Sequence, residues 1–166
     1  KGSIPRKLTI GASSDPFEQE ADRLANQVMT VPTHQVVDRT AHRLQGLAER
    51  SSNSLAPAPT SVYQALASPG QSLEPTLRRD MEQRFDHDFT QVRVHSDSSA
   101  VRSAQDIDAR AYTVGHNIVF GADQLKPSTV SGRHLIAHEL AHVVQQQGTR
   151  TSLVMRQPTA QARRMP

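Results

Sequence analysis

Near its C-terminal end the chain reads His138-Glu139-Leu140-Ala141-His142. Apolar residues recur at helical spacing around this H-E-x-x-H pattern and a glycine closes it, which predicts a helix over residues 129–147. Two histidines four positions apart lie on one helix face, so both imidazoles reach a single Zn²⁺ ion. Glu139 then lies beside the metal, where its carboxylate accepts a proton from water. The pattern predicts His138 and His142 as zinc ligands and Glu139 as general base; the alternative is a solvated helix with incidental histidines.

The third protein ligand must come from upstream or from outside this chain, because residues 143–166 contain no Asp, Glu or His. An upstream helix is predicted to begin at Pro16, which suits the first helical position. At about 100° per residue, Glu18 shares a face with Met29, and a carboxylate on a buried face needs a partner. Glu18 is therefore either the third zinc ligand or the acidic half of a capping box with Asp15.

Three further histidines lie within reach of such a site in principle. His134 is four residues before His138 on the same helix face. Three histidines in line along one helix do not easily surround a tetrahedral ion, so His134 is expected near the ligands rather than on the metal. His95 and His116 lie near predicted strand ends, where a lone histidine is expected to be a surface or capping residue.

The remaining patterns predict an α+β fold with a small β-sheet. The predicted elements are a helix over 74–86, a strand over 91–95, a helix capped by Ser96 or Asp97, and a hairpin or bent strand pair over 111–120. A weaker helix pattern covers residues 37–50. Residues 51–72 are rich in Ser, Ala, Pro and Gly, which is typical of a flexible linker or loop.

The charges divide the chain into a body and two ends. Its 166 residues suffice for one domain. Seven basic residues and no acidic ones lie in 1–14 and 147–166, which leaves 12 basic against 16 acidic residues between them. We therefore predict a basic arm at 1–14, a domain at 15–148 and a basic polar tail at 149–166. Because the body is acidic, the pI of about 9.8 does not indicate nucleic-acid binding.

Other classes are excluded by what the sequence lacks. No apolar run approaches the roughly 18 residues of a membrane span. The chain has no cysteine, so it forms no disulfide and no thiolate metal site. It begins Lys1-Gly2-Ser3-Ile4-Pro5, without an initiator Met or an apolar signal region. We expect an excised or processed piece of a longer chain, with no signal peptide.

One segment of the upstream helix adds a family resemblance. Glu18-Gln19-Glu20-Ala21-Asp22 resembles the E-x-E-A-D segment that follows H-E-x-x-H in compact gluzincin peptidases. There the first Glu binds zinc and the Asp orients a histidine ligand, which implies Glu18 as ligand and Asp22 as its outer partner here. In this chain the segment precedes the H-E-x-x-H helix, as in a circular permutation. The resemblance implies a compact zincin-like domain with a second metal-ligand helix.

A second resemblance covers roughly residues 13–147, with a divergent middle at 33–72. It rests on residues 15–23, 89–97, 111–115 and 118–120, and most specifically on residues 134–146. These blocks resemble the metallopeptidase domain associated with extracellular contractile injection systems, the eCIS core domain. This implies a toxin or effector that resides in the bacterial cytoplasm before loading and is then delivered by the particle. Tube or sheath components of that particle are the implied partners.

The resemblance leaves two functions open. The first is a zinc peptidase that acts on polypeptide, including its own parent chain by autoproteolysis. The second is a catalytically inactive module that packages a toxin into the injection particle. For the first, Tyr112 is expected to donate its O–H to the oxyanion, unless it is a strand aromatic packed in the core. Residues 33–72, between the two ligand helices, are expected to cover the site as an inhibitory plug.

Overall fold

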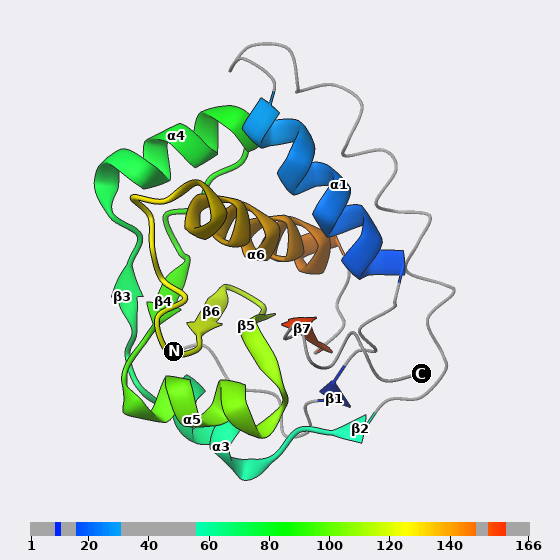
Figure 1. Cartoon of the computed structure of the whole chain (residues 1–166), viewed down its shortest axis with the longest axis vertical. Helices are drawn as coiled ribbons and strands as arrows, with labels where there is room; N and C mark the ends of the chain where they lie inside the picture. Colours follow the sequence, from blue (N-terminus) through cyan, green and yellow to red (C-terminus); the bar gives the residue numbers. More distant parts are fainter. Residues whose placement is uncertain (1–8, 11–15, 31–55, 149–152, 159–166) are drawn as a thin grey trace.

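A mixed β-sheet separates two layers of helices in the computed structural model (Figure 1). The structure describes residues 9–10, 16–30, 56–148 and 153–158. The sheet has the strand order β2-β1-β7-β5-β6-β4-β3, in which β1 and β7 are parallel, β4 and β6 are parallel, and the other neighbours are antiparallel. The α+β class predicted from the sequence is confirmed.

The elements follow the sequence patterns closely in the second half of the chain. The helices are α1 Pro16–Thr30, α3 Thr60–Ala67, α4 Pro75–Phe85, α5 Ser98–Asp106 and α6 Val130–Gly148. The strands are β1 Thr9–Ile10, β2 Ala56–Pro57, β3 Gln71–Ser72, β4 Arg93–His95, β5 Ala109–Val114, β6 Asn117–Phe120 and β7 Leu153–Pro158.

Two helices begin at acidic caps. The Glu74 carboxylate accepts hydrogen bonds from the backbone N–H groups of Thr76 and Leu77 at 3.1 and 2.9 Å, and Pro75 follows at the first helical position of α4. Asp97 accepts from the N–H of Ala100 at 2.8 Å and starts α5. Each cap satisfies backbone donors that have no partner within the helix. Of the two caps expected for α5, the structure selects Asp97.

The sheet buries a different core on each face. Helices α1, α4 and α6 cover one face, where Met81, Leu140 and Phe120 belong to one hydrophobic cluster. Helices α3 and α5 cover the other face, where Tyr112 and Val114 lie. Because successive side chains of a strand point to opposite faces, Thr113 of β5 faces α6 while its neighbours do not. This alternation decides which residues of β5 can reach the H-E-x-x-H helix.

The prediction of a flexible loop at 51–72 is wrong for residues 56–72. They form β2, α3 and β3, and Val62, Ala65 and Leu66 are buried in the core under the sheet. The spacing i, i+3, i+4 of these three residues carries a helical signal that the Pro- and Ser-rich composition outweighed in the sequence analysis. The prolines lie outside the helix and bound it.

The terminal segments also differ from the prediction. Thr9–Ile10 of the expected arm and Leu153–Pro158 of the expected tail pair as neighbouring parallel strands. The prediction of polar ends rested on their basic residues and did not take account of the apolar run Leu153-Val154-Met155. The predicted cap Asp15, the weak helix at 37–50 and the remaining arm and tail residues lie outside the described residues. Among the described helices, none combines the length and the apolar character needed to cross a bilayer.

The helical state of residues 60–67 is testable by substitution. Leu66→Ala should lower the free energy of unfolding by about 2–4 kcal/mol, because it opens a cavity in the core shared with α5. Gln64→Ala on the exposed side of the same helix should change it by less than about 0.5 kcal/mol. Urea denaturation of the two variants measures both values. Equal, near-zero effects would show that the segment is a loop.

Candidate metal centre

The centre is built where α1 packs against α6. Ala21 of α1 and Ala141 of α6 are fully buried and lie in one cluster with Leu24. Small side chains at a helix crossing let the two backbones approach closely. This packing brings the first turn of α1 against the H-E-x-x-H turns of α6, although the two segments are far apart in sequence (Figure 1).

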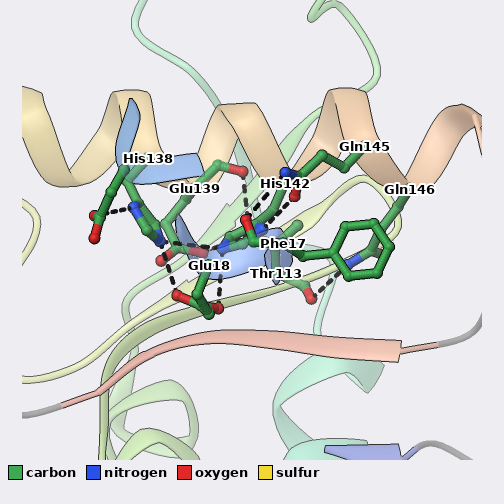
Figure 2. A network of polar contacts seen from close by, with 9 residues as sticks. Phe17, Glu18, Thr113, His138, Glu139, His142, Gln145 and Gln146 are labelled. Atoms are coloured by element: carbon green, nitrogen blue, oxygen red, sulfur yellow. Dashed lines mark hydrogen bonds and ion pairs between the residues drawn. The ribbon is translucent and has the colours of Figure 1, made fainter. Parts of the chain in front are cut away.

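Three side chains converge at this crossing. The Glu18 carboxylate lies 3.2 Å from Nε2 of His138 through Oε2 and 3.1 Å from Nε2 of His142 through Oε1. The two Nε2 atoms are 3.1 Å apart. All three residues are buried, with exposures of 5%, 1% and 0%. Their ligand atoms lie within 4.8 Å of one another, so the cluster can hold a metal ion (Figure 2).

The outer nitrogen of each ring faces an acceptor. Nδ1 of His138 lies 2.9 Å from a carboxylate oxygen of Asp22. Nδ1 of His142 lies 2.7 Å from Oε1 of Gln145. The amide of Gln145 is oriented by its other end, since its Nε2 donates to the carbonyl of Phe17 at 3.1 Å. Each Nδ1 therefore carries its proton, and the Nε2 atoms face Glu18.

This arrangement requires a cation between the three groups. Two Nε2 atoms with lone pairs and a carboxylate, all buried, repel one another unless a proton or a metal ion lies among them. A proton on His138 supplies part of the positive charge. Burial alone lowers the pKa of His138, but hydrogen bonds from its ring to Asp22 and Glu18 outweigh burial and raise the pKa to about 10. The donor set thus fits a metal ion.

The Glu18 carboxylate is ionised in this setting. Burial alone raises its pKa, but the charge of His142 and hydrogen bonds with both histidines outweigh burial and lower the pKa from 4.5 to about 2. Both oxygens of Glu18 contact ring nitrogens. A carboxylate used in this way is oriented into the cluster, which favours the ligand interpretation of Glu18 over the capping box.

Glu139 lies beside the three donors and is held by the sheet. The hydroxyl of Thr113 donates to Oε2 of Glu139 at 2.6 Å and lies 3.2 Å from the carbonyl oxygen of the same residue. The other oxygen, Oε1, is buried and has no hydrogen-bond partner among the described residues. Burial raises the pKa of Glu139, and the nearby histidines only partly offset this. One oxygen is fixed and the other is left to accept a proton.

Two glutamines that the sequence analysis did not select fix α6 in place. Gln145 connects His142 to the backbone just before Glu18. Gln146 accepts from the N–H of Gly115 through Oε1 and donates to the carbonyl of Thr113 at 3.1 Å. Both are buried, with exposures of 2% and 7%. Polar residues at buried positions of an otherwise apolar helix face were the signal available in the sequence.

Tyr112 does not join the centre, which corrects the expectation of an oxyanion donor. It is buried on the opposite face of the sheet, where its hydroxyl and that of Ser103 are 2.7 Å apart. Burial raises the pKa of the phenol above its ordinary value. The strand alternation places Thr113, and not Tyr112, on the α6 side.

The other histidines that the structure describes lie outside the cluster of three. Half-buried His134 contacts Asn26 of α1 at 2.8 Å, next to the turn that carries Asp22. His95 is buried between Ser68 and Asn117, at 3.0 and 3.1 Å. His134 therefore connects the same two helices as the centre without reaching the ligand atoms.

The fold and the site define an α+β domain with a buried Glu-His-His cluster able to hold a metal ion. Residues 72–150 match the family model described as the eCIS core domain, which supports an association with extracellular contractile injection systems. The match spans α4 through α6, including the H-E-x-x-H turns, and does not include Glu18 on α1. No curated protein and no solved structure matches the chain.

Gln145 gives a test of how the centre is oriented. Gln145→Ala removes the acceptor for Nδ1 of His142 and should weaken Zn²⁺ binding by about 10- to 100-fold. Gln147→Ala, two residues on at an exposed position of α6, serves as the matched control. Competition with a chromophoric chelator measures both affinities. Equal affinities in the two variants would contradict the orienting role.

The pH dependence of metal binding follows from His138. Its pKa of about 10 means that it carries an extra proton at neutral pH, which a metal ion must displace. Zn²⁺ binding should therefore release about one proton at pH 7 and strengthen as the pH rises from 6 to 8. Glu18, with a pKa of about 2, contributes no proton in this range. Calorimetry in buffers of different ionisation enthalpy counts the protons; a count of zero would contradict this cluster as the binding site.

Proposed function

We propose that this domain is a zinc-dependent peptidase of an injection-system toxin or effector. The observation that carries the proposal is the position of Glu139: it is buried beside the Glu18-His138-His142 cluster, with one oxygen bonded to Thr113 and the other without a partner among the described residues. A carboxylate placed in this way is suited to accept a proton from an attacking water. The gluzincin resemblance supplies the same roles for these residue types.

Zinc is the metal that this donor set favours. Two ligands about 2.0–2.1 Å from a tetrahedral zinc lie roughly 3.3 Å apart. The three separations in the cluster are 3.1, 3.1 and 3.2 Å. Imidazole and carboxylate donors suit Zn²⁺, and a set of three leaves a fourth position for the reaction. A zinc ion held here supplies Lewis acidity toward water and a peptide carbonyl.

The residues around the centre have two roles: some orient the ligands, and one transfers the proton. Asp22 and Gln145 hold the rings of His138 and His142 with their Nε2 atoms inward. Thr113 fixes Oε2 of Glu139, which leaves Oε1 to accept the proton and later to deliver it to the leaving amine. Because burial raises the pKa of Glu139, the carboxylate is a stronger base than an exposed one.

The substrate that we propose is a polypeptide, in the first place the longer chain that carries this domain. The association with contractile injection systems supports a role on cargo that such a particle loads and delivers. A peptidase on such cargo has its own parent chain and the particle's tube or sheath components within reach. Self-processing before or after delivery is the activity that we favour.

The burial of the centre supports a second candidate. Glu18, His138 and His142 are at most 5% exposed. Closed metal sites of this kind also occur as structural sites that stabilise a fold. In that case the domain is a catalytically inactive packaging module for a toxin, and its metal contributes folding energy rather than turnover.

Glu139→Gln separates the two candidates. For a peptidase, the substitution should lower the cleavage rate of the zinc-loaded protein by about 10²–10⁴-fold, because it removes the general base. Zinc affinity should remain similar, since Glu139 is not among the three ligands. Mass spectrometry of a digested peptide library measures cleavage. The matched control is Glu20→Gln, which changes a half-buried carboxylate of α1 that pairs with Arg23 instead of the centre. Zinc-loaded wild-type protein that binds metal but cleaves nothing would support the packaging module.

A further inference from the structure

The strand next to the candidate centre is supplied by the chain's own C-terminal segment. Strand β7 pairs antiparallel with β5, with Met155 opposite Thr113, Arg156 opposite Tyr112 and Gln157 opposite Ala111. Thr113 is the residue that bonds to Glu139. The backbone at Met155 is therefore placed directly across from the residue that fixes the proposed general base.

The path of β7 crosses both helices of the centre. Besides β5, it contacts α1, which carries Glu18, and α6, which carries the two histidines. Figure 2 shows β7, drawn in pale red, running past the cluster alongside β5. A peptide that approaches Glu139 in extended form along β5 would have to take the place of residues 153–158.

On the basis of the proposed function, we propose that this edge of β5 is the binding site for an extended polypeptide and that residues 153–158 occupy it as a built-in competitor. Adding a strand to a sheet edge uses backbone hydrogen bonds, which accept many sequences. Residues 149–152 alone join β7 to α6. A short connection gives the segment an effective concentration in the millimolar range, well above that of most free substrates.

The far side of β7 holds it only weakly. There it pairs with β1, a strand of two residues, which pairs in turn with β2, also of two residues. Most of the pairing of β7 is therefore with β5. A segment held mainly along one edge separates more readily than a strand paired along its full length on both sides. Its release exposes the β5 edge beside Glu139 without unfolding α1 or α6.

A reversible tether tests this inference in the full chain. Ala111 and Gln157 are register partners, and the chain has no cysteine of its own. The double substitution Ala111→Cys with Gln157→Cys should form a disulfide that locks β7 on β5, since cross-strand partners are close enough to be bridged. Reduction of the same protein releases the strand. Each single cysteine variant is a control that cannot form the crosslink.

The probe is a fluorescent peptide with the sequence of residues 151–160. It is added to the zinc-loaded tethered protein in the Glu139→Gln background, so that binding is measured without turnover. We expect the reduced form to bind at least about tenfold more tightly than the oxidised form. Equal binding by both forms, with the disulfide confirmed by mass spectrometry, would overturn the inference and leave β7 as a structural strand.

A second variant guards against loss of folding. Replacing residues 153–158 with a Gly-Ser sequence of equal length should increase peptide binding over the wild type, while the same replacement at 159–164 should not. Zinc affinity reports whether the centre is intact in each. The same variants are also prepared with Glu139 retained, and their cleavage of the peptide is measured. If the peptide binds but these proteins do not cleave it, the proposed peptidase is refuted while the binding site on β5 stands. Cleavage at equal rates in oxidised and reduced tethered protein would refute the competitor role alone.

Discussion

The contact between one buried carboxylate and two buried imidazoles determines how the rest of the structure is arranged. Glu18 is 5% exposed, and a carboxylate at that depth is stable only with a cation or strong donors beside it. His138 and His142 supply these contacts from the facing helix. The small residues of the α1–α6 crossing, the outer contacts of Asp22 and Gln145, and the attachment of Gln146 to β5 all maintain this approach.

The same constraint explains why chain order matters little here. Glu18 lies 120 residues before His138, yet the two side chains are in contact. What the buried charges require is that α1 and α6 cross at the correct turns, and small residues on both helices permit this regardless of connectivity. The sheet contributes the second requirement, because Thr113 of β5 is the neighbour that positions Glu139.

Sequence signals that span only a few residues predicted the structure best. The cap at Asp97, the hairpin and the H-E-x-x-H helix depend on residues within a few positions of one another, and these elements formed as expected. The average composition of a segment predicted its structure poorly. The Pro-rich stretch at 51–72, predicted as a loop, contains the buried helix α3, and the basic tail at 149–166 contains β7. For Tyr112 the sequence left two alternatives, an oxyanion donor and a core aromatic, because a strand's period alternates sides but does not say which side the site is on. The structure has the core aromatic.

By itself, the sequence determined that two imidazoles lie on one helix face with a carboxylate next to them, because the period of an α-helix fixes that geometry within five residues. Only the tertiary structure decided that Glu18 faces both imidazoles, that Gln145 orients one of them and that β7 lies along β5 beside Glu139. These contacts join residues separated by tens of positions. They depend on which faces are buried against each other, and packing of the whole chain determines that.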